Sequence, residues 1–129
     1  MKPSPSPARL RERLRESLKI ALHARDAIAI AAFRSAMSAV DNAEAVDRSQ
    51  APAPTAGMIG DVHLGVGAGE VARRELSHHD VHEVVRAEIR DRTAAAAEYE
   101  RLGRADHASR LSAEARVLTS FLETALIEP

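Results

Sequence analysis

The sequence contains no cysteine, which excludes disulfide bonds, thiolate metal ligands and cysteine nucleophiles. It also contains no tryptophan, and its phenylalanine and tyrosine residues are only Phe33, Phe121 and Tyr99. A core with so few aromatic rings has to be aliphatic and rich in alanine, which suits closely packed helices better than a sheet.

A strong excess of one charge is lacking too. The formal net charge is -1, with 18 Lys and Arg residues against 19 Asp and Glu residues, so nothing draws the whole chain towards nucleic acid. No apolar run approaches the length of a transmembrane helix, and the N-terminus lacks the apolar region of a secretory signal. The 129 residues therefore predict one soluble, cytoplasmic, mostly helical domain that does not associate with membranes.

Two helices are expected in the first third of the chain. Residues 1–7 are rich in proline and predict a disordered lead. A first helix is expected from about Ala8 to Arg25, and a second, capped by Asp26, reaches about Ala45. The apolar positions at helical spacing are Leu10, Leu14, Leu18, Ala21 and Leu22 in the first helix, and Ala29, Ile30, Phe33, Ala36, Met37 and Val40 in the second. The other face of the first helix is mainly basic, with Arg9, Arg11, Arg13, Arg15 and Lys19.

Residues 47–76 are expected to form an irregular loop, because glycine and proline recur there too often for a helix interior. A loop of this length is uncommon in a small domain. One interpretation is a short extended segment on the core, and the other is a partly ordered connector with no activity of its own. The apolar residues that favour contact with the core are Met58, Ile59, Val62, Leu64 and Val66.

The last third predicts an antiparallel helical hairpin. The sequence from Ser77 to Asp80 has the form of a capping box, so a helix is expected from about His78 to Leu102. Gly103 supplies a left-handed stop, and the next helix starts near Asp106. So short a break between two long helices forces them to lie antiparallel. The apolar positions are Val81, Val84, Val85, Ile89, Ala95, Ala96, Tyr99 and Leu102 in the first helix, and Leu111, Ala115, Leu118, Leu122 and Ala125 or Leu126 in the second.

Glu88 and Arg92 fall inside the apolar arc of the first hairpin helix, where a charge is costly unless it is paired. The acid precedes the base by four residues, which is the favourable order for an ion pair. In one interpretation they pair with each other, or with Glu114 on the facing helix, and fix the register of the hairpin. In the other, Arg92 binds an anion or an RNA phosphate.

A histidine cluster begins the same helix. His78 and His82 are four residues apart, a spacing that places two imidazoles on one helical face, and His79 and Glu83 are adjacent. These residues suit a weak zinc or nickel site, but no HExxH motif is present and no third ligand is expected nearby. The competing interpretation is a solvated helix terminus, and no metal ligand is assigned.

Arginines surround the hairpin and its turn. Guanidinium groups suit contacts with phosphate and carboxylate groups. Acidic residues are interleaved among them, and no aromatic residues alternate with them to stack on bases, so a salt-bridged surface is the competing interpretation. The arginines are Arg86, Arg90, Arg101, Arg104 and Arg110.

No catalytic motif is present: the sequence has no Gly-x-Ser-x-Gly elbow, phosphate-binding loop, Ser-Lys amidase pattern or dinucleotide fingerprint. Catalysis by this chain alone is therefore not expected, and no catalytic residue or cofactor is assigned.

Several segments together resemble the YqeY-like proteins, which share a helical domain with the C-terminal region of GatB, a subunit of the tRNA-dependent amidotransferase. These segments are residues 13–26, 33–46, 87–108 and 114–122. The residues within them that carry the resemblance most are Arg34, Asn42, Glu44, Glu88, Arg92, Tyr99, Gly103, Arg104, Asp106 and Glu114.

The resemblance implies an all-α fold in which two N-terminal helices pack on the C-terminal antiparallel hairpin, with a long Gly/Pro/Ala loop between them. It implies a charged pair at Glu88 and Arg92. The family label, carbon–nitrogen ligation with glutamine as the amido donor, belongs to the amidotransferase complex. Leu122-Glu123 stands where family members continue with Leu-Pro, and the smaller C-terminal helical subdomain of the family is expected to be absent.

Three functions remain open, in this order. The first is a non-catalytic accessory module that binds RNA, above all tRNA, or an amidotransferase-like partner. The second is a protein-interaction module, including a homodimer, although the sequence does not set the oligomeric state. The third is an enzyme fragment with a metal at His78, His82 and Glu83. The RNA or partner contacts of the first would be Arg86, Arg90, Arg92, Arg101 and Arg104.

Overall fold

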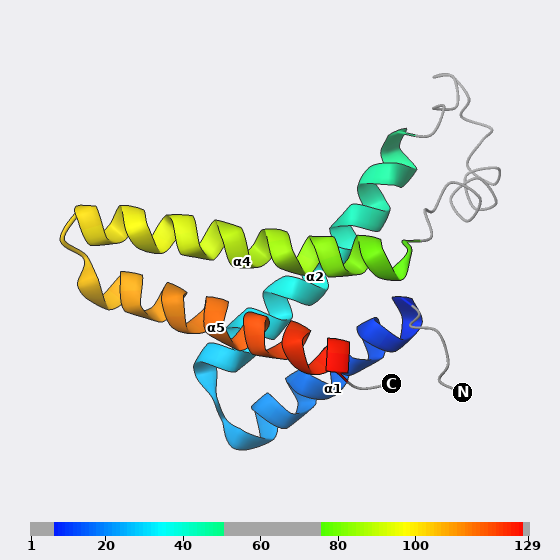
Figure 1. Ribbon diagram of the computed structural model, residues 1–129, viewed down its shortest axis with the longest axis horizontal. Helices are drawn as coiled ribbons and strands as arrows, with labels where there is room; N and C mark the ends of the chain where they lie inside the picture. Colours follow the sequence, from blue (N-terminus) through cyan, green and yellow to red (C-terminus); the bar gives the residue numbers. More distant parts are fainter. Residues whose placement is uncertain (1–6, 51–75, 128–129) are drawn as a thin grey trace, which may run out of the picture.

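The computed structural model describes residues 7–50 and 76–127, and four helices lie in these two ranges (Figure 1). They are α1 (Pro7–Ala24), α2 (Ala27–Gln50), α4 (His78–Arg101) and α5 (Ala105–Ile127). Helices α4 and α5 form an antiparallel hairpin, and α1 and α2 pack against it. The predicted all-α fold class is confirmed.

The hairpin is longer than the part that the N-terminal helices cover. Helix α2 crosses both α4 and α5, and α1 packs against α2 and α4 (Figure 1). The opposite end of the hairpin, where the chain turns from α4 into α5, projects beyond α1 and α2. We call this projecting end, residues 96–110, the hairpin tip.

Two helix boundaries differ from those expected. Helix α1 begins at Pro7, a residue of the expected lead, because proline suits the first helical position. Helix α2 continues to Gln50, five residues past Ala45, because glycine and proline are absent until Pro52. The rest of the expected lead lies outside the described residues, and so do Met58, Ile59 and the other apolar loop residues, whose contact with the core was one of two interpretations.

Both short connections end a helix with the same hydrogen-bond pattern. After α1, the Arg25 amide donates to the Leu22 carbonyl (3.2 Å) and the Asp26 amide to the Ala21 carbonyl (3.0 Å). This is a Schellman motif, with Arg25 in the left-handed position at φ 56°. The Asp26 carboxylate then accepts from the Ala29 amide at 3.1 Å and caps α2, as the sequence predicts.

The turn between α4 and α5 repeats this pattern with glycine. The Gly103 amide donates to the Glu100 carbonyl (3.1 Å), and the Arg104 amide donates to the Tyr99 carbonyl (2.8 Å). Gly103 has φ 77°, which confirms the predicted left-handed stop.

At the other end of α4, the predicted capping box is confirmed. The Asp80 amide donates to Ser77 Oγ at 3.0 Å, and the Ser77 amide donates to Asp80 Oδ2 at 3.1 Å. Leu76 before the cap and Val81 after it are both buried in the core, at the two positions of a hydrophobic staple.

The core is aliphatic, as expected, and lies where α1, α2 and the proximal half of the hairpin meet. Its two aromatic rings, Phe33 and Phe121, pack edge to face with centroids 5.9 Å apart. Phe121 was not among the expected apolar positions of its helix. Conversely, Leu22 and Leu102 are 43% and 63% exposed, because Leu22 is rotated by about 100° from buried Ala21 and Leu102 ends α4 at the tip.

Most of the other predicted apolar positions lie in the core or pack on it, whereas Ala95, Tyr99 and Leu111 are half-buried and outside the core cluster. The buried ones are Leu10, Leu14, Ala21, Ala29, Phe33, Ala36, Val40, Val81, Val85, Ala96, Ala115, Leu118 and Leu122. The partly buried ones packed on the core are Leu18, Ile30, Met37, Val84, Ile89 and Ala125. Among the helices in the described ranges, none is both long and apolar enough to span a bilayer.

Candidate functional site

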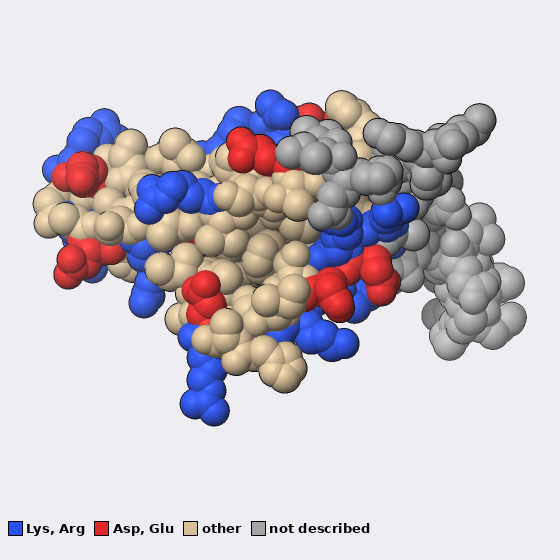
Figure 2. Space-filling model, turned by 60° about the horizontal axis from the view of Figure 1, so that its bottom comes forward, with Lys and Arg blue, Asp and Glu red and all other residues tan. Residues whose placement is uncertain are grey.

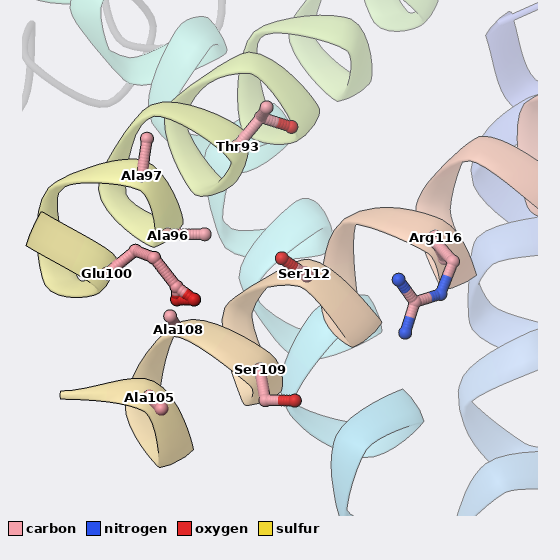
Figure 3. A pocket seen from close by; sticks show the side chains of 9 residues that line it. All are labelled: Thr93, Ala96, Ala97, Glu100, Ala105, Ala108, Ser109, Ser112 and Arg116. Carbon is pink, nitrogen blue, oxygen red and sulfur yellow. The ribbon is translucent and has the colours of Figure 1, made fainter. Parts of the chain in front are cut away.

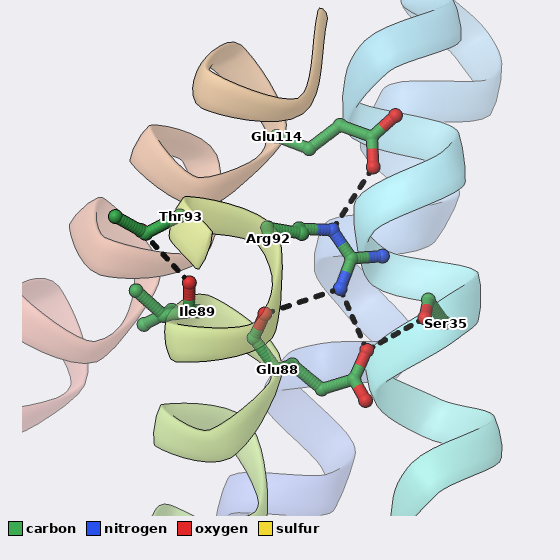
Figure 4. A network of polar contacts seen from close by, with 6 residues as sticks. All are labelled: Ser35, Glu88, Ile89, Arg92, Thr93 and Glu114. Atoms are coloured by element: carbon green, nitrogen blue, oxygen red, sulfur yellow. Dashed lines mark hydrogen bonds and ion pairs between the residues drawn. The ribbon is translucent and has the colours of Figure 1, made fainter. Parts of the chain in front are cut away.

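Arg92 lies where α2, α4 and α5 come together (Figure 4). Its Nη1 donates to Glu88 Oε1 at 2.7 Å on the same helix, and its Nε donates to Glu114 Oε1 at 2.9 Å on α5. Ser35 of α2 donates its hydroxyl to the same Glu88 oxygen at 2.6 Å. The structure therefore brings together Glu88, Arg92 and Glu114, and joins them to α2 through a serine that the sequence did not point to.

This network is nearly closed to solvent. The side chains of Arg92 and Glu114 are 12% and 9% exposed, and that of Glu88 is 18% exposed. Burial is the largest influence on the pKa of Arg92 and lowers it, but the hydrogen bonds and charges of Glu88 and Glu114 outweigh burial and raise the pKa. Arg92 is therefore a fixed cation that holds two carboxylates from facing helices.

A second buried carboxylate, Glu44, joins α2 to α1. The Glu44 residue is 5% exposed, and its side chain forms an ion pair and hydrogen bond with Arg11. Sequence reasoning placed Arg11 on the solvated face of the first helix and assigned Glu44 no partner. The signal was present, however, because Glu44 follows Val40 by four residues and so continues the apolar stripe of α2.

The remaining predicted contact residues are exposed. Arg86 is 3.8 Å from Glu83, and Arg101 pairs with Glu98, each within one helical turn. No ion pair of Arg90 is found in the described part of the chain. Arg86, Arg90 and Arg101 lie on one side of α4 by helical spacing, whereas Arg92 lies on the opposite side. The five predicted contacts are thus divided between a surface and a buried network.

The tip carries a group of ring contacts that the sequence did not suggest. The rings of Tyr99 on α4 and His107 on α5 have centroids 4.3 Å apart. The Arg104 guanidinium lies 5.8 Å from the centroid of the Tyr99 ring, within cation–π range. Tyr99 and His107 are eight residues apart and come together only because the chain turns at Gly103.

Charges of both signs surround this tip. Figure 2 shows acidic and basic side chains interspersed at the hairpin end, with no broad patch of one sign on the face that it displays. The field therefore favours a partner that offers specific contacts over general attraction to any polyanion.

Two hollows lie on the face of the hairpin turned away from the Arg92 network. The distal hollow, of about 590 Å³, has a small-residue lining that includes Ala97, Ala105 and Ser109, with Glu100 at one end and Arg116 at the other (Figure 3). The proximal hollow, of about 330 Å³, lies between the His82–Arg90 part of α4 and the Thr119–Glu123 part of α5. Their linings follow one another at helical spacing on both helices, so they share one open face.

The family comparison identifies the part of the chain that forms this hairpin. The family model described as Yqey-like protein matches residues 65–128, about half of the chain. Through this segment the chain belongs to the YqeY-like family. Glu88, Arg92 and Glu114 of this YqeY-like hairpin lie inside the matched segment, as does the tip. Ser35 and the N-terminal segments that also carry the resemblance lie outside it. No curated protein and no solved structure matches the chain.

The histidines of this YqeY-like chain do not assemble a metal site among the described residues. The rings of His78 and His82 are 6.3 Å apart, and no group of three candidate ligands lies close enough together to hold a metal ion there. The Nε2 atom of His82 is buried and has no hydrogen-bond partner within residues 7–50 and 76–127. Burial first, and then the charge of Arg86 and the neighbouring His78, lower the pKa of His82.

Proposed function

We propose that this YqeY-like chain is a non-catalytic helical module that binds RNA, above all tRNA, with its hairpin tip. The observation that carries the proposal is the group formed by Arg104, Tyr99 and His107 at the projecting end of the hairpin. The resemblance to the tail of GatB, which belongs to a tRNA-dependent enzyme, supports tRNA as the RNA.

The tip combines the two kinds of contact that single-stranded RNA offers. Exposed bases stack on aromatic rings and on guanidinium planes, and phosphates accept hydrogen bonds from arginine. Arg104 provides a guanidinium plane beside an aromatic pair, and the exposed Arg101 precedes it by three residues in the chain. The Arg101–Glu98 pair is exposed on both sides, and such pairs stabilise a protein by at most about 1 kcal/mol, so a phosphate can replace Glu98.

The proposal divides the predicted contact residues by their exposure. Arg86, Arg90, Arg101 and Arg104 are exposed, and of these Arg101 and Arg104 lie at the tip and are proposed to face the RNA. The donors of Arg92 already face two carboxylates in a nearly closed space. We therefore assign Arg92 the other role that the sequence suggests, fixing α4 against α5.

The test is a fluorescence-anisotropy titration of labelled total tRNA with the whole chain and with two double variants. Replacing Arg101 and Arg104 by glutamine should weaken binding about tenfold or more, and should reduce the salt slope by about one unit per lost contact. The matched control replaces Arg15 and Lys19 on α1, which removes the same charge far from the tip. Equal losses in both variants would show a general charge effect and contradict the assignment.

The distal hollow favours a second candidate function, a protein-interaction module that includes a homodimer. In an antiparallel pair of two copies, Glu100 at one end of each hollow meets Arg116 at the other end of its partner's. Light scattering at high concentration tests the homodimer, and a strict monomer would remove it. A pull-down with amidotransferase subunits tests a different protein partner.

A further inference from the structure

The proximal hollow on the open face has the size and lining of a small-molecule site. Its volume of about 330 Å³ lies at the lower end of the range for ligand pockets. Ile89 of α4 and Leu122 of α5 contribute apolar surface, and Thr119 adds a hydroxyl group. Such sites are mostly apolar, with a few polar groups that orient the ligand.

The polar groups on the α4 side are basic and regularly spaced. His82, Arg86 and Arg90 follow each other at intervals of four residues and all line the hollow. Arg90 has no ion pair among the described residues, and the contact of Arg86 with Glu83 is long at 3.8 Å. The α5 side contributes one carboxylate, Glu123, so two guanidinium groups face a single acid across an apolar floor.

We propose that this hollow binds a small organic anion, with its carboxylate or phosphate group on Arg86 and Arg90 and its apolar part on Ile89 and Leu122. The guanidinium groups provide charge-assisted hydrogen bonds, and the apolar residues distinguish an organic anion from an inorganic one. This proposal goes beyond RNA binding, because the hollow is at the opposite end of the hairpin from the tip and requires an apolar group that a backbone phosphate lacks.

The pKa of His82 gives a second, independent measure of anion binding in the hollow. Its imidazole has the partnerless Nε2 atom and meets the positive field of Arg86 and the neighbouring His78 and His79, with Glu83 opposing them. Among the described residues, Glu123 is the only acid that lines the hollow from α5. An anion bound between the two arginines offsets the positive field, and therefore raises the pKa of His82.

The experiment is an NMR titration of the whole ¹⁵N-labelled chain with phenyl phosphate, inorganic phosphate and benzyl alcohol, which separates the charge from the ring. Phenyl phosphate should shift the amides of residues 82–90 and 119–123 saturably. It should bind about tenfold or more tightly than inorganic phosphate, because burial of a ring contributes apolar area, and also more tightly than benzyl alcohol. The imidazole of His82 should titrate at higher pH when phenyl phosphate is bound.

Three exposed substitutions make the assignment specific. Arg90→Gln should weaken phenyl phosphate binding about tenfold, since a charge-assisted contact is lost. Glu123→Gln should strengthen binding about twofold, because the only acid opposite the arginines is removed. Arg110→Gln, on α5 but outside the hollow, is the matched control and should leave the affinity unchanged.

Several results would overturn the proposal. If inorganic phosphate binds as tightly as phenyl phosphate, the arginines are general phosphate contacts. If benzyl alcohol binds equally well, the hollow is apolar only. Shifts confined to the tip, or equal losses for Arg90→Gln and Arg110→Gln, would place the anion elsewhere. The tRNA experiment depends on Arg101 and Arg104, so the two proposals can fail separately.

Discussion

At the residue scale, Arg92 shows how a charge becomes tolerable on the core-facing side of a helix. Three ionised groups lie together there, and each desolvated carboxylate has a charged donor. The helical wheel and the i,i+4 order pointed to Glu88 and Arg92, because both are properties of one helix. The hydrogen bond of Ser35 depends on where α2 crosses α4, which no local pattern records.

Removing the guanidinium should therefore cost more than removing an exposed one. We predict that Arg92→Leu lowers the free energy of unfolding by about 3–5 kcal/mol, because two buried carboxylates lose their partner. Arg92→Lys should cost about 1.5–3 kcal/mol, since one ammonium cannot reproduce the fork that bridges both acids. Urea denaturation followed by circular dichroism measures both, with Arg110→Leu as an exposed control. A loss for Arg92→Leu no larger than that of the control would contradict the structural role.

His82 gives a prediction for pH. Its pKa is lowered in the folded state from 6.5, so the unfolded chain binds the proton more readily. Its contribution to stability is then present above about pH 6.5 and is lost as the pH falls towards the lowered value. As the pH falls from 7.5 to 5.5, the free energy of unfolding of the natural chain should decrease more than that of His82→Gln. The exposed His79→Gln is the control, and a difference independent of pH for His82→Gln would contradict this account.

At the scale of elements, the two helix connections show which helix ends can be predicted from the sequence. Serine, aspartate and glycine at the right offsets located both ends of α4, because capping depends on residues close together in the chain. Arg25 occupies the same left-handed position as Gly103, but an arginine, unlike a glycine, does not indicate a left-handed conformation in the sequence. The spacing of α1 and α2 located their connection, and the left-handed arginine was not foreseen.

The two left-handed residues predict stability changes of opposite sign. Arg25→Gly should raise the free energy of unfolding by about 0.5–1 kcal/mol, because glycine adopts positive φ without a steric penalty. Gly103→Ala should lower it by about 1 kcal/mol. A Cβ at Gly103 meets no atom within 4 Å, so that loss comes from the backbone alone. Thermal unfolding of both variants measures the difference, and changes of the same sign would contradict the shared motif.

At the scale of the whole molecule, the all-α class and the hairpin could be predicted, because helical periodicity and a short break determine them locally. The contact of Arg92 with Glu114 across the hairpin was one of the interpretations of the sequence. The other contacts between helices could not be predicted, since they depend on crossing geometry. Arg11 with Glu44 joins positions 33 residues apart, and Tyr99 meets His107 across a turn. The two binding proposals rest on the tip and the proximal hollow, and both form through contacts between helices that the sequence did not predict.

The most direct test of RNA binding at the hairpin tip is the salt dependence of the unmodified chain's affinity for tRNA. Labelled tRNA and a scrambled RNA would be titrated at about 50 mM and about 200 mM salt. We predict tighter binding of tRNA than of the scrambled RNA at both concentrations, and a steep loss with salt that corresponds to several phosphate contacts. Absence of binding at the lower salt concentration, or equal affinity for both RNAs, would contradict the proposal and direct the search to protein partners.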